Sequence, residues 1–416
     1  MKVNYNRLIS ADTANMKQSF PRFALFLAAL LGSTAAHAET QQVTPYADIR
    51  YRLELVEQAG LPDTAAASTL RIRVGVRTRE WRGFSAVVEG EGILVLGEPT
   101  YNDTVNGKIN YPIVADPSDI LLNQAYVRWR PNVGVEVTGG RQTVNFENQR
   151  WVGSVGWRQN DQTLDAARFA LKPVKGVTLD YFYAWRVNRV FGPDSPQGIW
   201  RNTQIHGARA SYQLGGIGTL SVHALLLDIP SSPTLSSQTF GVRIAGERKI
   251  GQGTSLLYAA EYASQQDYGL NPNRFRLDYF LIEPGVRLGG FTLKGGYEQL
   301  EGNGVVALQT PLATLHAFNG WADKFLTTPA TGLRDIYFDA GYKFPANGPL
   351  PGLALRFGWH DYNATVGAID YGKEWNGSVS LPLGKSFTLT AKVARYEANL
   401  FATDTTKGWL QIEAKF

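Results

Sequence analysis

The sequence predicts an all-β fold, a transmembrane antiparallel up-and-down β-barrel of about 18 strands. Three observations lead to this prediction. The N-terminus carries an export signal, the rest of the chain alternates apolar and polar residues, and long connections alternate with short ones. Successive side chains of a strand point to opposite faces, so a strand between lipid and water needs this period of two.

An export signal occupies the N-terminus. An apolar run at 23–31 follows the basic residues Lys17 and Arg22 and precedes Ala36-His37-Ala38. This order predicts a secretory signal peptide over residues 1–38, cleaved after Ala38. The run is too short for a membrane-spanning helix, which needs roughly 20 apolar residues.

Residues 39–416 are predicted to form one domain, the outer-membrane barrel of a Gram-negative cell, with no linker or low-complexity tract. Whether translation begins at Met1 or at Met16 stays open. The chain has no cysteine, which excludes disulfides and thiolate metal sites. The net charge of +5 falls further when the basic leader is removed, so we expect no nucleic-acid partner.

The last segment shows the alternation clearly. In 407–416, Leu410, Ile412, Ala414 and Phe416 share one face, and mostly polar residues occupy the other. We expect the barrel-assembly machinery to recognise this strand through its terminal aromatic residue. The complete set of predicted strands is 46–56, 69–79, 83–92, 121–130, 133–142, 165–172, 176–187, 203–213, 217–227, 238–248, 254–264, 274–288, 291–300, 334–344, 352–362, 373–383, 386–397 and 407–416.

The connections between these segments alternate in length. The long ones include 93–122, 143–164 and 301–333, whereas the short ones include Trp81-Arg82 and Gly289-Gly290. Outer-membrane barrels have long extracellular loops and short periplasmic turns, and a soluble sandwich has no reason to sort its loops in this way. The alternation therefore favours a closed barrel that leaves no sheet edge in lipid.

The polar face of the first three strands is rich in arginine and carboxylates. A turn near residue 81 predicts Arg71 opposite Glu91 and Arg73 opposite Glu89, and a loop centred near residue 62 predicts Glu54 opposite Arg71. The predicted lumen and solute-binding residues are Arg50, Arg52, Arg71, Arg73, Arg77, Glu89, Glu91, Arg168 and Arg356. Further basic residues predicted to face inward are Arg186, Arg209, Arg243, Lys294, Lys343 and Lys392.

Two interpretations of these arginines stay open. In the structural one, ladders of arginine and carboxylate stiffen a wide barrel and keep its wall wet. In the functional one, they form a track for an anionic solute, because guanidinium is always charged and binds carboxylates with two hydrogen bonds. Rings of arginine or lysine are a known device of anion pores.

The long loops contain too many apolar residues for disorder, and loops of this length are usually functional. We predict that at least one of 143–164 and 301–333 folds into the lumen and narrows it. The alternative is that both only cover the outer rim. The candidate constriction residues are Arg150, Arg158, Asp161 and Asp165.

Two loop stretches resemble the alginate export porin family. One joins Gly140-Arg141-Gln142 to residues 148–159 and 162–165, and the other covers residues 309–325. The resemblance extends over essentially the whole exported chain. It implies an 18-stranded outer-membrane barrel through which a solute diffuses, and in one branch of the family that solute is an anionic polysaccharide.

The expected function is passive diffusion of a hydrophilic, anionic solute, such as a sugar acid or oligosaccharide, across the outer membrane. The alternative is export of an anionic exopolysaccharide such as alginate with periplasmic partners. The expected partners are outer-membrane lipid and a small hydrophilic solute. An enzyme is not expected, because His206, His223, His316 and His360 lie in no recognisable nucleophile motif. No metal or cofactor is expected, since the sequence has neither a spaced histidine cluster nor a phosphate-binding glycine loop.

Overall fold

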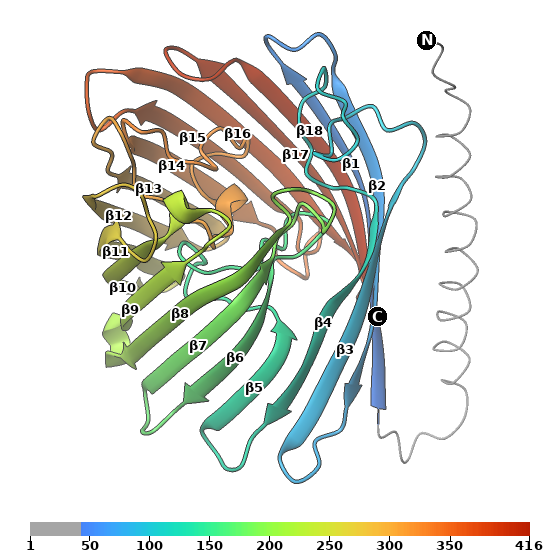
Figure 1. Ribbon diagram of the computed structural model, residues 1–416, viewed down its shortest axis with the longest axis vertical. Helices are drawn as coiled ribbons and strands as arrows, with labels where there is room; N and C mark the ends of the chain where they lie inside the picture. Colours follow the sequence, from blue (N-terminus) through green and yellow to red (C-terminus); the bar gives the residue numbers. More distant parts are fainter. Residues whose placement is uncertain (1–42) are drawn as a thin grey trace.

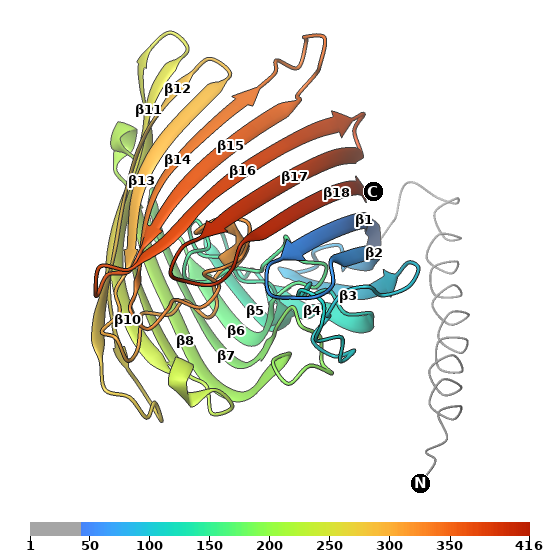
Figure 2. The ribbon, with the colours of Figure 1, turned by 90° about the horizontal axis from the view of Figure 1, so that it is seen from above.

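The computed structural model describes residues 43–416, which form one closed sheet of 18 antiparallel strands (Figures 1 and 2). Each strand pairs with its neighbours in sequence, and the first strand also pairs with the last. The predicted fold class and strand number are therefore confirmed. The predicted signal peptide, its cleavage site and Met16 lie outside the described residues.

The 18 strands overlap the predicted segments one for one. Their bounds are β1 Val43–Gln58, β2 Ala65–Thr78, β3 Phe84–Val95, β4 Asp119–Trp129, β5 Val135–Gln142, β6 Thr163–Leu171, β7 Val177–Asn188, β8 Ile199–Gln213, β9 Thr219–Asp228, β10 Ser237–Gly251, β11 Thr254–Asp267, β12 Arg276–Leu288, β13 Phe291–Leu300, β14 Leu333–Lys343, β15 Ala354–Asn363, β16 Asp370–Leu383, β17 Phe387–Ala398 and β18 Thr405–Lys415. Three short 3-10 helices, η1 Gly215–Ile217, η2 Pro233–Leu235 and η3 Leu315–Ala317, lie in connections. No helix in residues 43–416 is long and apolar enough to cross a membrane.

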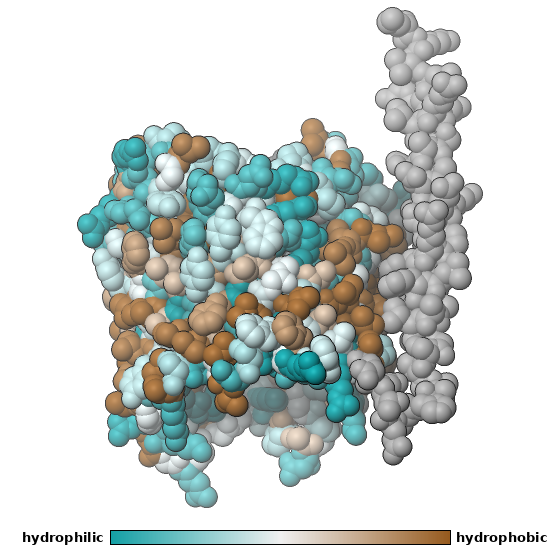
Figure 3. Space-filling model, turned by 60° about the horizontal axis from the view of Figure 1, so that its bottom comes forward, coloured by the Kyte–Doolittle hydropathy of each residue, from teal (hydrophilic) through white to brown (hydrophobic). Residues whose placement is uncertain are grey.

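The outer face of the barrel is apolar around its middle. Large hydrophobic residues such as Val127, Phe240, Val242 and Phe338 are exposed there, and a brown band of apolar residues runs across the face seen in Figure 3. Their neighbours along each strand face inward and are buried, as the period of two requires. The buried residues include many charged side chains, so the interior is polar near the wall.

The hairpin between β2 and β3 has a different register from the predicted one. Arg73 lies opposite Glu91, whereas the sequence pattern predicted Glu89. Arg82 (φ 51°) and Gly83 (φ 83°) adopt left-handed backbone, which places the centre of the turn one residue later. Such a displacement moves partners by two positions and leaves every side chain on its predicted face.

The hairpin between β1 and β2 is shifted for a related reason. Its loop is confined to residues 59–64, because both strands extend further than predicted. Arg50, not Glu54, lies opposite Arg71, and the carboxylate that pairs with Arg71 is Asp48 at 2.5 Å.

Candidate channel constriction

Loop 143–162, between β5 and β6, folds into the barrel as predicted. The Trp151 indole nitrogen donates a hydrogen bond to Glu261 of β11 (2.5 Å), and the Arg150 guanidinium pairs with Glu298 of β13 (2.9 Å). Four strands separate β6 from β11 in the sheet order, and six separate it from β13. The loop therefore crosses the lumen (Figures 1 and 2).

Loop 301–332, between β13 and β14, meets loop 143–162 inside the barrel. The Gly153 amide donates to the Leu312 carbonyl (2.8 Å), and the Val155 amide donates to the Thr314 hydroxyl (3.0 Å). The two loops thus form one body with shared backbone hydrogen bonds.

The local backbone of loop 143–162 explains this tight contact. Glu147 (φ 46°), Gln149 (φ 67°) and Val155 (φ 54°) all lie in the left-handed region, which is strained for a β-branched residue such as Val155. A Cβ atom at Gly153 would lie 2.2 Å from the Thr314 hydroxyl oxygen. Glycine is therefore required at the point where the loops approach.

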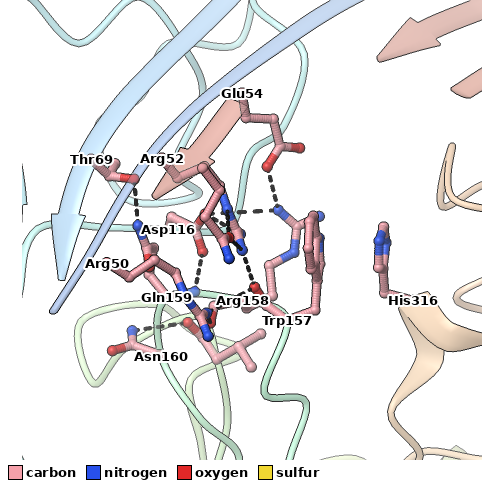
Figure 4. Close-up of polar contacts among 12 residues, drawn as sticks. Arg50, Arg52, Glu54, Thr69, Asp116, Trp157, Arg158, Gln159, Asn160 and His316 are labelled. Atoms are coloured by element: carbon pink, nitrogen blue, oxygen red, sulfur yellow. Dashed lines mark hydrogen bonds and ion pairs between the residues drawn. The ribbon is translucent and has the colours of Figure 1, made fainter. Parts of the chain in front are cut away.

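The wall formed by β1 and β2 holds the tip of loop 143–162 through arginine donors (Figure 4). Arg50 donates to the carbonyl oxygens of Gly156, Trp157 and Arg158 at 3.1–3.3 Å. Arg52 donates to the Trp157 carbonyl at 2.5 Å, and its guanidinium stacks 4.2 Å above the Trp157 ring. These wall arginines bind loop backbone.

Carboxylates complete the coordination of the wall arginines. Glu413 of β18 accepts from Arg50 at 2.7 Å and lies 3.3 Å from Arg71. Arg73 pairs with Glu91 and, at 2.9 Å, with Asp161 of the loop. Such pairing is needed because an unpaired buried charge is strongly destabilising.

The remaining predicted lumen residues lie away from this contact. Glu89 accepts hydrogen bonds from Asn123 and Gln124 of β4. Arg77 is exposed at the turn end of β2, with its guanidinium 4.5 Å from the Tyr46 ring. Arg168 pairs with Asp180 of β7 at 2.9 Å.

Arg158 connects the constriction to three elements. Its guanidinium lies 3.1 Å from Glu54 of β1 and 2.9 Å from Asp323 of loop 301–332. Asp116 of the β3–β4 loop lies 3.9 Å away. Burial alone would lower the pKa of Arg158, but these three carboxylates hold it above its ordinary range. Arg158 is therefore a permanent cation at the meeting point of the loops.

Asp323 is the matching anion. It pairs with Lys407 of β18 at 2.8 Å and with Arg158 at 2.9 Å. Burial alone would raise the pKa of Asp323, but His316, Lys407 and Arg158 hold it well below its usual range. The carboxylate stays ionised and links loop 301–332 to loop 143–162 and to the last strand.

A cage of tryptophan rings surrounds a lysine at the same place. The Lys392 ammonium of β17 lies 3.7 Å from the centre of the Trp157 ring, 4.0 Å from Trp321 and 5.2 Å from Trp409. It also lies 2.8 Å from His316 Nε2. Tryptophan faces attract cations, so the cage stabilises this partly desolvated charge.

His316 is neutral in this arrangement. Burial lowers its pKa to about 3, with Asp323 opposing that effect and Lys392 adding to it. Neutral imidazole has one donor and one acceptor nitrogen. Nδ1–H therefore donates to Asp323 (2.7 Å), and Nε2 accepts from Lys392.

The four candidate constriction residues separate into two groups. Arg150, Arg158 and Asp161 lie in the inward loop and contact the barrel wall at β13, β1 and β2, respectively. Asp165 does not belong to the constriction, because it lies in β6 between Leu164 and Ala166, whose side chains are buried in the barrel. Its own side chain is on the outer face and accepts from Arg141 of β5 at 2.6 Å.

Sequence reasoning missed Glu54, Asp116, Asp323 and the tryptophan cage as parts of the constriction. His316, Trp321 and Asp323 lie within the stretch 309–325 that carries the resemblance, so that motif contained the available signal. Among residues 43–416, no group of three or more His, Cys, Asp or Glu side chains is placed to hold a metal ion.

Comparisons with known proteins agree with this architecture. The family described as Alginate export matches residues 65–270, so the predicted resemblance is confirmed there, while the second motif lies beyond the match. No curated protein matches the chain. The family is one of transport proteins and not of enzymes, in agreement with the sequence prediction.

Several solved structures share the fold at low sequence identity. OpdL of Pseudomonas aeruginosa is 15% identical, with 91% of this chain and 99% of that chain covered and a TM-score of 0.69. OpdK of the same organism, crystallised with vanillate, is 14% identical, with 89% and 98% covered and a TM-score of 0.69. OccAB2 of Acinetobacter baumannii is 15% identical, with 90% and 98% covered and a TM-score of 0.69. The fold is therefore that of outer-membrane porins.

Proposed function

Because this outer-membrane porin resembles the alginate export family over residues 65–270, we propose that it is a passive channel for small hydrophilic anions. Sugar acids and short acidic oligosaccharides are the solute class. The observation that carries this proposal is Arg356 of β15, a guanidinium on the lumen wall whose side chain is 50% exposed.

Arg356 differs from the buried wall arginines because its donors are exposed to solvent. Within residues 43–416 its ion-pair partner is Asp339 at 2.5 Å, and the guanidinium lies 5.2 Å from the Trp321 ring. An exposed guanidinium beside an aromatic face suits a sugar acid, whose carboxylate binds the cation while its ring packs on tryptophan. OpdK, which shares the fold, was crystallised with vanillate, and that ligand is also a small carboxylate.

The second candidate function is export of an anionic exopolysaccharide with periplasmic partners. The description of the matched family favours it. A polymer would have to pass loops 143–162 and 301–332, which are hydrogen-bonded to each other across the lumen. Export therefore requires these loops to move.

Planar-bilayer recording of the refolded protein tests the proposal. In a KCl gradient we expect the sign of the reversal potential to show that chloride is more permeant than potassium. We also expect di- and triuronates to reduce the current. Neutral oligosaccharides of equal length serve as the control. Cation preference, or equal block by the neutral sugars, would refute the anionic solute class. Loss of secreted polymer on gene deletion would support the exporter instead.

The proposal also includes the route to the membrane. Residues 1–38 would direct export, and the barrel-assembly machinery would recognise the C-terminal strand through Phe416, which is 64% exposed. The Phe416 ring packs at 6.0 Å against Phe387 of β17. Deleting Phe416 should lower the amount of folded barrel in the outer membrane, and unchanged amounts would contradict this role.

A further inference from the structure

Charged side chains gather on the outer face of the barrel where β5 to β8 meet the long loops. They are Arg141 of β5, Asp165 of β6, Arg186 of β7 and Arg201 of β8, and all lie within a few residues of the loop ends of their strands. Cross-strand pairs join Arg141 to Asp165, Asp165 to Arg186, and Arg186 to Arg201. They form one continuous patch, which we call the outer arginine patch.

A β-bulge turns Arg186 away from the lumen. The strict alternation of the sequence predicted this residue on the inner face. In the structure Ala184 pairs with Ala166 but Arg186 pairs with Asp165, so Trp185 is an extra residue in β7. Trp185 is exposed on the outer face, and the next residue after the arginine, Val187, is fully buried inside. A bulge changes the direction of the side chains that follow it, and here it places a second cation on the lipid side.

The outer arginine patch has more cations than its own carboxylate can neutralise. Asp165 accepts from Arg141 with both oxygens, at 2.6 and 3.0 Å. Arg186 Nε is 3.8 Å from Asp165 Oδ2 and, although buried, has no hydrogen-bond partner. Within residues 43–416, Arg201 is exposed and has neither an ion pair nor a side-chain hydrogen bond.

Two of these arginines face each other directly. Arg186 and Arg201 are cross-strand partners in the β7–β8 ladder, and like charges directly opposite each other destabilise a sheet. Asn202, next to Arg201, has a left-handed backbone (φ 54°) and contributes to the irregularity that brings the two together. An anion between the two guanidinium groups would convert this repulsion into attraction.

The patch lies at the level of the lipid headgroups. Trp185 is 43% exposed on the outer face directly next to Arg186, and exposed tryptophans mark the membrane interface in outer-membrane barrels. The long loops identify this end of the barrel as the extracellular one. Long basic side chains at such a level reach the polar headgroups.

We propose that the outer arginine patch binds the phosphate of a phosphorylated lipid in the outer leaflet. Guanidinium presents a planar pair of donors that matches two phosphate oxygens. Arg186 and Arg201 bind the phosphate, and Arg141 orients Asp165 so that Arg186 stays in place. This site is separate from the lumen and does not depend on the solute that the channel carries.

The test compares three proteins refolded in neutral detergent: the unchanged protein, the double variant Arg186→Gln/Arg201→Gln, and Arg395→Gln. Arg395 is the matched control, since it is exposed near the loop end of β17 and donates to Thr406 (2.8 Å), with the carboxylates of Glu57 and Asp404 lining the same surface. Each protein is titrated with bisphosphorylated lipid A, with dephosphorylated lipid A and with inorganic phosphate. Bound lipid is measured by native mass spectrometry. Thermal stability is measured by gel electrophoresis, as the temperature at which the band of the folded barrel shifts to that of the unfolded chain.

We expect the unchanged protein and Arg395→Gln to bind bisphosphorylated lipid A equally, and the double variant to bind it at least about tenfold more weakly, the loss expected for one charge-assisted contact. Without lipid the double variant should be as stable as the unchanged protein or more so, because the repulsion is gone. Equal binding by the double variant would overturn the proposal. Equal stabilisation by inorganic phosphate would identify a free-anion site instead, and a change of oligomeric state would identify a subunit interface.

Discussion

The two sides of the lumen use arginine in different ways. On β1 and β2, four arginines are buried and pair with carboxylates, and three of them also donate to loop carbonyls; they are Arg50, Arg52, Arg71 and Arg73. On β15, Arg356 is half exposed with one carboxylate partner. The same side chain therefore holds the inner loops on one side and remains open to solvent on the other. Exposure of the guanidinium to solvent decides which of the two roles an arginine can have.

The energetics of burial explain why the arginines of β1 and β2 need so many carboxylate and carbonyl partners. Removing a charge from water costs several kcal/mol, and only close partners offset that cost. Each buried arginine of β1 and β2 accordingly contacts at least one carboxylate, from the barrel wall or from a loop. An exposed guanidinium needs less compensation and can exchange partners, as a transient solute site requires.

The largest expected effect is on the buried side. Replacing both Arg150 and Arg158 by Ala leaves Glu298, Glu54 and Asp323 without their guanidinium partners. Breaking a buried pair costs about 3–5 kcal/mol, so the inner loops should detach. We expect higher single-channel conductance and lower anion preference in planar bilayers.

The control for that double variant is Arg287→Ala, which removes an exposed pair with Glu247 at the turn end of the barrel. It should leave conductance and selectivity as they are. If the double variant also conducts with unchanged amplitude and selectivity, neither arginine maintains the constriction.

A smaller effect is expected where the two loops touch. Gly153→Ala introduces a Cβ atom 2.2 Å from the Thr314 hydroxyl oxygen, and such overpacking typically costs about 1–3 kcal/mol. We expect more current noise and faster proteolysis within loop 143–162. Gly156→Ala is the matched control, because its Cβ would approach other atoms no closer than 4.0 Å. Equal noise and proteolysis in the two variants would show that the close contact is unimportant.

On the exposed side, Arg356→Gln should weaken block by uronates without enlarging the channel. An exposed ion pair is worth up to about 1 kcal/mol, which corresponds to roughly a fivefold rise in the half-blocking concentration. Arg356→Lys keeps the charge and should recover part of the loss. A rise in conductance comparable to that of Arg150→Ala/Arg158→Ala would place Arg356 with the loop-holding arginines.

The smallest expected effect is a change of selectivity with pH. Burial, with Lys407 nearby, lowers the pKa of Lys324 in loop 301–332 to about 8, while Glu374 and Asp323 oppose that shift. A lysine is charged below its pKa, so one positive charge disappears between about pH 7 and pH 9. Anion preference should fall over that interval, and reversal potentials measured at fixed salt gradient detect the change.

Lys324→Gln should remove this pH dependence. At every pH its anion preference should equal the lower anion preference that the unchanged protein has at high pH. Persistence of the same pH profile in Lys324→Gln would assign the titration to another group.

The strands and their faces could be predicted from the sequence, because the period of two acts locally along each segment. The register of the first hairpins could not, since it depends on turn geometry at Arg82 and Gly83 that the alternation does not contain. Arg186 is predicted on the lumen face for a similar reason: the bulge at Trp185 adds one residue, and strict alternation fails beyond it. Asp165 was grouped with the inward loop because β6 begins earlier than predicted, at Thr163.

The inward loops were predicted from their length and composition, but their contacts were not. Arg158 meets Glu54 and Asp323 from three distant parts of the chain, and no local pattern encodes such a meeting. The sequence therefore predicted the loop residues of the constriction, such as Arg158, but not the wall residues that they contact, such as Glu54.

The pairing of β1 with β18 joins residues from the two ends of the chain, such as Ile49 and Ala414. This seam can form only after the last strand has been synthesised. Arg158 pairs with Glu54 of β1, and Asp323 pairs with Lys407 of β18. The inner loops therefore connect the two strands of the seam from inside the barrel. The loops that narrow the lumen therefore also stabilise the closure of the barrel. A barrel without these loops should separate more readily between β1 and β18, and it should also have a higher conductance.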